Sequence, residues 1–142
     1  MTFTDNPKTD VDLFEAVDEL DLPAGEFAIF GSGPMIVRRI IPPTNDLDIV
    51  CRGDAWCRVR ELGTVRYLEE YDVTVAEILD GKITCGPKWG IGDFDTDMLI
   101  DTAELIRGLP FVRMEHVIQY KRIAGRAKDI RHIRAAMRMG YA

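Results

Sequence analysis

Residues 27–51 constrain the fold of this chain more than any other stretch of its sequence. An apolar run, FAIF, stops at a turn built around Gly31 and Ser32, and a second apolar run follows the pair Asp46 and Asp48. Because successive side chains of a strand point to opposite faces, Asp46 and Asp48 are expected on the same face. The stretch therefore predicts two strands, the second of which carries two neighbouring carboxylates.

Two carboxylates on one strand face repel each other unless they are hydrated or share a cation. Mg²⁺ suits such a pair, because it takes one or two carboxylates and completes its coordination with water and substrate phosphate. The glycines of the turn let a ligand approach the main chain, where a helix N-terminus would favour phosphate. Two alternatives remain open: the glycines make only a tight turn, or Arg38 or Arg39 forms an ion pair with Asp48.

The chain resembles the DNA-polymerase-beta-type nucleotidyltransferase superfamily in two segments that occur in the expected order. The first is the Gly-Ser turn at 31–32 followed by Asp-Leu-Asp at 46–48, and the second is Lys121 followed by GRAKD at 125–129. The second segment is similar to the tail of small bacterial members, including AbiEii-toxin-like nucleotidyltransferases. The resemblance implies an α/β (α+β) nucleotidyltransferase-like fold, with a small mixed or antiparallel sheet of four or five strands flanked by helices.

The same resemblance implies a Mg²⁺-dependent enzyme that moves a nucleoside monophosphate from an NTP to an unidentified acceptor hydroxyl. Asp46 and Asp48 would hold the metal and take part in catalysis. The residues expected to bind the nucleotide are Gly31, Ser32, Arg38, Lys121, Arg126 and Lys128.

A third catalytic carboxylate is not evident in the sequence. Active members of the superfamily place this acid on a neighbouring strand, where Thr84 stands in this chain. Glu77, on the preceding strand of an expected hairpin, is a candidate substitute. The alternative function is therefore a catalytically degenerate nucleotide-binding or protein-interaction module of the same fold, antitoxin-like or regulatory.

The charge of the chain is distributed unevenly. The net charge is −6, but residues 113–138 hold eight Lys or Arg against two acids, which leaves −12 on the remainder. The acidic total argues against loose binding to nucleic acid through phosphate attraction. The basic C-terminal helices are either solvated or face an anion, which could be a triphosphate, nucleic acid or an acidic protein partner.

Length and composition predict a cytoplasmic protein that does not enter the membrane. With 142 residues, we expect a flexible N-terminus at 1–9 and a single domain over 10–142, including a helical part at 113–138. No apolar run is long enough for a membrane span, and the polar N-terminus is unlike a signal peptide. The three cysteines form no Cys-x-x-Cys motif, which favours reduced thiols and gives no support to a zinc site.

Periodicity and turn residues predict the remaining elements. Strands are expected at 26–30, 46–50, 73–79 and 82–85, with Asp80-Gly81 as a hairpin turn, while 66–70 is ambiguous. Helices are expected at 10–20, 34–41, 54–63, 98–107 and 114–124, followed by a last helix whose inner face is Ile130, Ile133 and Met137. Lys121 falls on the inner stripe of its helix, so it either snorkels to an edge or reaches a charged site.

Overall fold

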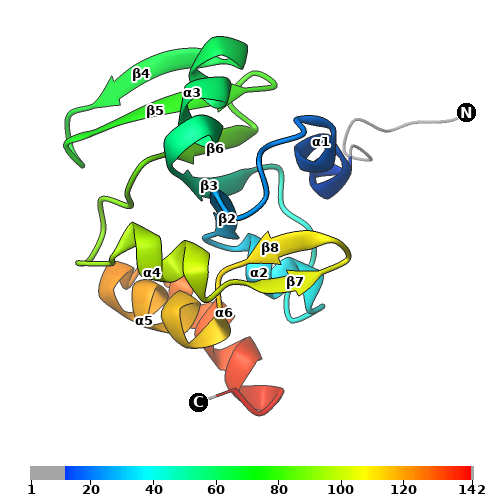
Figure 1. The fold of residues 1–142 in the computed structure, drawn as a ribbon. Helices are drawn as coiled ribbons and strands as arrows, with labels where there is room; N and C mark the ends of the chain where they lie inside the picture. Colours follow the sequence, from blue (N-terminus) through cyan, green and yellow to red (C-terminus); the bar gives the residue numbers. More distant parts are fainter. Residues whose placement is uncertain (1–11, 142) are drawn as a thin grey trace, which may run out of the picture.

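Seven strands form one mixed sheet in the computed structural model, which describes residues 12–141. Residues 1–9, expected to be flexible, lie outside the described residues. The strands are β2 (Phe27–Phe30), β3 (Leu47–Cys51), β4 (Thr64–Leu68), β5 (Val73–Ile78), β6 (Ile83–Gly86), β7 (Glu104–Ile106) and β8 (Leu109–Phe111). Their order across the sheet is β4-β5-β6-β3-β2-β8-β7 (Figure 1). The pairs β3–β6 and β2–β8 are parallel, and the other neighbours are antiparallel.

The mixed α/β class is confirmed, but the expected count of four or five strands is wrong. The four strands expected from the sequence correspond to β2, β3, β5 and β6, and β4 includes part of the ambiguous segment. The helix expected at 98–107 ends at Asp101, and the short hairpin of β7 and β8 follows it. Strands of three residues carry too little alternation to be recognised, so the pairing of β8 with β2 and of β7 with β8 becomes visible only in the tertiary structure.

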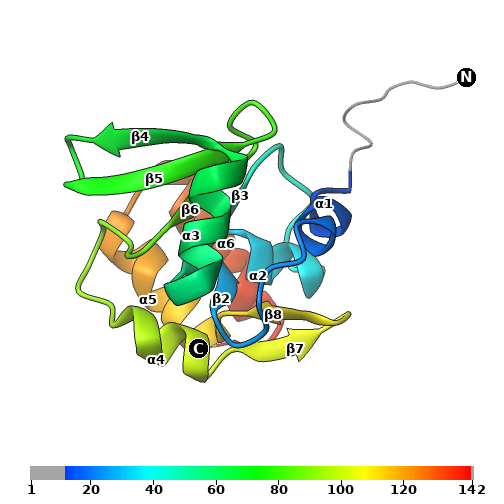
Figure 2. The same cartoon turned by 45° about the horizontal axis from the view of Figure 1, so that its top comes forward.

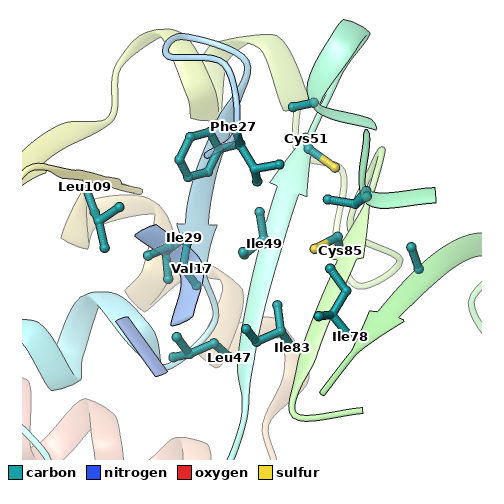
Figure 3. Packing of buried hydrophobic residues seen from close by; sticks show 14 of the residues in the cluster. Val17, Phe27, Ile29, Leu47, Ile49, Cys51, Ile78, Ile83, Cys85 and Leu109 are labelled. Carbon is teal, nitrogen blue, oxygen red and sulfur yellow. The ribbon is translucent and has the colours of Figure 1, made fainter. Parts of the chain in front are cut away.

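In the part of the chain that the structure describes, six helices cover the two faces of the sheet. They are α1 (Leu13–Glu19), α2 (Gly33–Val37), α3 (Gly53–Leu62), α4 (Thr96–Asp101), α5 (Met114–Ala124) and α6 (Ala127–Arg138). The side chains of Ile29 and Ile49 pack with α1 and α3 on one face (Figure 3). Phe30 and Val50, one position further along each strand, pack with α4 and α5 on the other face. Alternation along β2 and β3 thus divides the core into two layers.

The three C-terminal helices, α4, α5 and α6, lie together below the β4–β5 hairpin in both views (Figures 1 and 2). As expected, α5 buries Val117 and Ile118. The inner face expected for α6 is wrong at two of its three residues, because Ile130 is 45% exposed and Met137 is 55% exposed, whereas Ile133 is half-buried. The buried face of α6 instead carries Asp129 and Ala136. The carboxylate of Asp129 can be buried because it forms ion pairs with Lys121 and Arg126. Within residues 12–141, no helix has the length and apolarity needed to cross a membrane.

Candidate functional site

A cavity of about 260 Å³ lies between the sheet and the beginning of α6. Strands β3, β4, β5 and β6 contribute to its lining, together with the Gly-Ser turn, the loop that follows β6, and α5. Eight of the nine residues selected from the sequence line it: Gly31, Ser32, Asp46, Asp48, Glu77, Lys121, Arg126 and Lys128. Segments that are far apart in the chain therefore converge on one site.

The two aspartates lie on the cavity face of β3 and just before it. Leu47, between them, is buried in the core on the opposite face (Figure 3). Asp48 sits directly against the glycine turn, since a Cβ added to Gly31 would lie 2.7 Å from Asp48 Oδ2. Among the described residues, neither Asp46 nor Asp48 forms an ion pair. Both carboxylates therefore remain available to a cation.

The electrostatic environment of Asp48 disfavours its negative charge. Burial, and secondarily the charge of Asp46, raise its pKa from 3.8 to about 7. The cations of Lys128, Lys121 and Arg126 oppose this rise without cancelling it. A carboxylate in this state gains free energy when a cation binds beside it, because the cation offsets both the repulsion and the loss of hydration.

Asp48, Thr84 and Glu77 form a row across three adjacent strands. Asp48 of β3 is paired with Thr84 of β6, which is paired with Glu77 of β5. Directly opposed residues present their side chains on the same face, so the three side chains share the cavity face. Two strand spacings separate the Asp48 and Glu77 backbones by roughly 10 Å. Glu77 forms an ion pair with Arg66, whose Nε lies 3.4 Å from Glu77 Oε2.

Lys121 links the glycine turn to α6. Its Nζ donates to Ser32 Oγ at 3.1 Å and to Asp129 Oδ1 at 3.4 Å. The side chain is only 1% exposed, so it does not snorkel to an edge but reaches a charged site. Burial lowers the pKa of the ammonium, whereas the carboxylate of Asp129 opposes this change. The ammonium is thus held beside the turn at which the phosphates are expected.

Asp129 was not selected as a site residue from the sequence, yet it organises the basic part of the cavity. Besides Lys121, it accepts a hydrogen bond from Arg126 Nε at 2.6 Å and one from the Arg126 backbone N–H at 3.1 Å. Arg126 also donates to Tyr120 Oη at 2.9 Å. In the sequence, Asp129 appeared only as the last residue of the GRAKD segment, without a role of its own. Asp129 can be buried because α5 places the ammonium of Lys121 beside its carboxylate.

Arg38 is the one selected residue that the structure places elsewhere. Its guanidinium donates to the carbonyl of Pro34 at 2.8 Å and pairs with Glu104. The side chain lines a separate hollow beside β7 and is absent from the lining of the cavity that holds Asp48. Arg38 lies away from the cavity because it pairs with Glu104, the first residue of β7. The β7–β8 hairpin was not recognised in the sequence, so this partner was not expected.

The remaining wall of the cavity is apolar or aromatic and was not anticipated. Trp89 packs edge-on against Phe30 and Tyr120, with ring centroids 5.6 and 6.3 Å apart. The other members of this wall come from the β4–β5 hairpin and the loop after β6: Leu68, Tyr71, Val73, Val75, Gly90 and Ile91. Lys88 adds one cation on that loop. No local pattern predicts that these two segments face each other.

Within residues 12–141, no three His, Cys, Asp or Glu side chains are grouped closely enough to hold a metal ion by themselves. The acidic set beside the turn is limited to Asp46 and Asp48, with Glu77 two strands away. Such a set can supply one or two carboxylate oxygens to a hard cation, with water or phosphate completing the coordination.

Gly31→Ala is expected to destabilise the protein by more than the matched variant Gly25→Ala. Both glycines have positive φ, +65° and +82°, but a Cβ at Gly25 meets nothing within 4 Å. Each variant carries a backbone cost of about 1–2 kcal/mol, and only Gly31→Ala also clashes with Asp48. Urea unfolding should show a further loss of roughly 1 kcal/mol or more for Gly31→Ala. Equal losses would show that the contact with Asp48 is relieved without cost.

The fold is similar to that of solved nucleotidyltransferases. A Thermotoga maritima protein, assigned provisionally to this class, is 15% identical with a TM-score of 0.56, covering 89% of this chain and 91% of that one. ANT(2″)-Ia in complex with adenylyl-2″-tobramycin is 24% identical with a TM-score of 0.54, covering 90% and 86%. A solution structure of the same antibiotic-resistance factor gives 24% identity and a TM-score of 0.53, covering 90% and 80%. These likenesses show the fold alone, and the sequence matches no family profile and no curated protein.

Proposed function

We propose that this chain is a Mg²⁺-dependent nucleotidyltransferase that moves a nucleoside monophosphate from an NTP to an acceptor hydroxyl. The observation that carries the proposal is the convergence of the acidic pair, the Gly-Ser turn and four cationic side chains on one cavity. Metal-binding carboxylates next to cations that neutralise phosphate are what phosphoryl transfer requires. Within this proposal, the resemblance of the segment from Lys121 to Asp129 supports a relation to the AbiEii-toxin-like members.

The carboxylates fit Mg²⁺. Asp46 and Asp48 form no ion pair among the described residues, and the raised pKa of Asp48 reflects a charge without a sufficient partner. Bound there, Mg²⁺ would neutralise charge on the phosphates and favour departure of pyrophosphate. Asp46 and Asp48 are therefore the proposed ligands, because both line the cavity at the Gly-Ser turn.

The protein groups would share the remaining work of positioning and charge neutralisation. The main chain at Gly31 and Ser32 lets a triphosphate approach closely, and the Lys121 ammonium lies 3.1 Å from Ser32 Oγ. Arg126 and Lys128 add positive charge at the start of α6. Glu77 is the proposed acceptor of the proton from the attacking hydroxyl, and it would reach past the short side chain of Thr84.

The proposed function is tested by titrating the protein with ATP, GTP, CTP and UTP, each with Mg²⁺ and with EDTA. We expect metal-dependent binding of at least one NTP, measured calorimetrically. Pyrophosphate release is then expected when small alcohols, peptides or RNA are supplied as acceptors. Absence of binding to all four NTPs in the presence of Mg²⁺ would refute the proposal.

A second candidate is a nucleotide-binding or protein-interaction module without transfer, antitoxin-like or regulatory. Two observations favour it: Thr84 stands beside Asp48 where an acid would complete the site, and Glu77 is already paired with Arg66. The exposed arginines of α6 would then serve an acidic protein partner. Binding of an NTP without pyrophosphate release, across all acceptors supplied, would favour this module over the enzyme.

Lys128→Ala is expected to weaken NTP binding about tenfold, which is roughly 1.4 kcal/mol. Lys128 is exposed, lines the cavity and forms no ion pair among the described residues, so its removal should leave the unfolding free energy within about 0.5 kcal/mol. Arg134→Ala is the matched control, because Arg134 is an exposed cation of α6 that does not line the cavity. Calorimetric titration should show unchanged affinity for the control. A similar loss in both variants would assign the effect to net charge.

A further inference from the structure

Four side chains that carry hydroxyls line the cavity: Ser32, Tyr71, Thr84 and Tyr120. Ser32 accepts a hydrogen bond from Lys121. Tyr120 is 4% exposed and accepts one from Arg126. Thr84 is fixed in β6 and is paired on both sides within the sheet. The hydroxyls of Ser32 and Tyr120 are therefore held by hydrogen bonds. The Thr84 hydroxyl forms no hydrogen bond among the described residues, but its backbone is fixed between two strands of the sheet.

Tyr71 differs from the other three. It lies in the turn between β4 and β5, is 36% exposed, and its hydroxyl has no hydrogen bond among the described residues. Its side chain packs on the loop after β6, where a Cβ added to Gly90 would lie 2.4 Å from Tyr71 Cβ. The missing side chain at Gly90 thus makes room for Tyr71 at the cavity wall.

Tyr71 lies on the side of the cavity from which an acceptor hydroxyl would attack the α-phosphorus. In phosphoryl transfer the attacking and leaving oxygens lie on opposite sides of the phosphorus. The proposed phosphate end is at Ser32 and Lys121, whereas Glu77 and Tyr71 both belong to the β4–β5 hairpin across the cavity. Leu68 and Val73 of that hairpin add an apolar wall beside Tyr71. An apolar wall suits an aromatic acceptor better than an acceptor that carries several positive charges.

We propose that Tyr71 is an internal acceptor, so that the chain transfers a nucleoside monophosphate to its own phenol oxygen; this rests on the proposed function. The Tyr71 oxygen forms a bond to the α-phosphorus, and the bond from that phosphorus to the bridging oxygen of the β-phosphate breaks. The phenol proton passes to Glu77, and pyrophosphate leaves. The product is a tyrosine phosphodiester that places a nucleotide on the acceptor side of the cavity.

The experiment incubates the full chain with each α-³²P-labelled NTP and Mg²⁺, without added acceptor, and maps the label by peptide mass spectrometry. Tyr71→Phe removes only the hydroxyl and is expected to abolish labelling. Tyr67→Phe is the matched control, because Tyr67 belongs to the same hairpin, donates to Asp72 at 2.7 Å and does not line the cavity. This control is expected to label at the wild-type level, and Asp48→Asn to label at least a hundredfold less.

The outcomes separate the two proposals. Label that persists in Tyr71→Phe, maps to Thr84, or is lost in acid as a lysine phosphoramidate would be, overturns the assignment to Tyr71 and leaves the transferase proposal standing. The same holds if the chain stays unlabelled while an added acceptor elicits pyrophosphate release. If no NTP binds in the presence of Mg²⁺, the proposed function fails, and the inference about Tyr71 fails with it.

Discussion

Asp48→Asn is expected to abolish nucleotide transfer and to stabilise the protein at pH 8. Removal of the carboxylate takes away a proposed metal ligand, so we expect transfer to fall by roughly 10²–10³-fold or more. The same substitution removes a charge that the fold holds at a cost, because burial and Asp46 raise the pKa of Asp48 to about 7. Loss of activity would then accompany a gain in stability, the opposite of what a purely structural defect produces.

The sign of the stability effect follows from linkage. The native pKa of Asp48, about 7, lies above the ordinary value of 3.8, so between these pH values the native state holds a proton that the unfolded state has released. The stability of the wild-type protein therefore falls as pH rises from about 4 to 7, and the deficit stays constant above pH 7. At 1.36 kcal/mol per pKa unit, and allowing for partial hydration, Asp48→Asn should gain roughly 2–4 kcal/mol at pH 8 and little at pH 4.

Urea unfolding at pH 4, 6 and 8 measures this difference, and Asp93→Asn is the control. Asp93 is an exposed loop acid without an ion pair among the described residues, so its variant should match the wild type at all three pH values. Mg²⁺ at pH 8 should stabilise the wild type and leave Asp48→Asn unaffected. A variant that loses stability at pH 8, or that still transfers nucleotide at the normal rate, would contradict the assignment of Asp48.

Asp129→Asn is expected to cost about 3–5 kcal/mol of unfolding free energy, the largest loss predicted for any single substitution considered for this protein. Asp129 is fully buried, and it pairs with Lys121, which is 1% exposed. With asparagine at position 129, the buried ammonium of Lys121 faces only neutral oxygens, those of Ser32 and of the new amide, and Arg126 loses its charged acceptor. The penalty comes from the uncompensated charge of Lys121 rather than from the loss of a favourable pair.

Two variants isolate this effect. Lys121→Met removes the buried charge and keeps an unbranched side chain, so it should cost clearly less than Asp129→Asn, although we expect transfer to be lost. Asp18→Asn changes an exposed helical acid and should stay within about 0.5 kcal/mol of the wild type. Chemical unfolding of the three variants decides between the mechanisms. Equal costs for Lys121→Met and Asp129→Asn would mean that packing, and not charge, determines stability at this position.

Asp129 should also make the protein sensitive to acid. Burial raises its pKa, but the hydrogen bonds from Arg126 and the charge of Lys121 outweigh burial and lower the pKa below 3.8. The corresponding stability is fully present above pH 3.8 and is lost as pH falls through the lowered value. Asp48 has the reverse dependence, because its carboxylate destabilises the fold once it is ionised. The half-buried carboxylate of Asp48 and the buried carboxylate of Asp129 thus respond to pH with opposite signs.

The sequence by itself determined the features that depend on local pattern. The alternation of Asp46, Leu47 and Asp48 was enough to place two carboxylates on one face, and the apolar runs at 27–30 and 49–51 identified the two central strands. The position of Lys121 on an inner helical stripe also followed from spacing alone. These features are local because strand and helix periods fix side-chain direction within a few residues.

Only the tertiary structure decided the features that depend on a partner from another segment. Pairing with β2 defines β8, and β7 then supplies the glutamate that draws Arg38 away from the cavity. Burial of Asp129 requires Lys121 to be delivered by α5, and the wall around Tyr71 requires the loop after β6 to pack on the β4–β5 hairpin. The period of a helix or strand carries no information about which distant segment will pack against it. The burial and the charged partners of Arg38, Asp129 and Tyr71 are therefore determined only when the chain has folded.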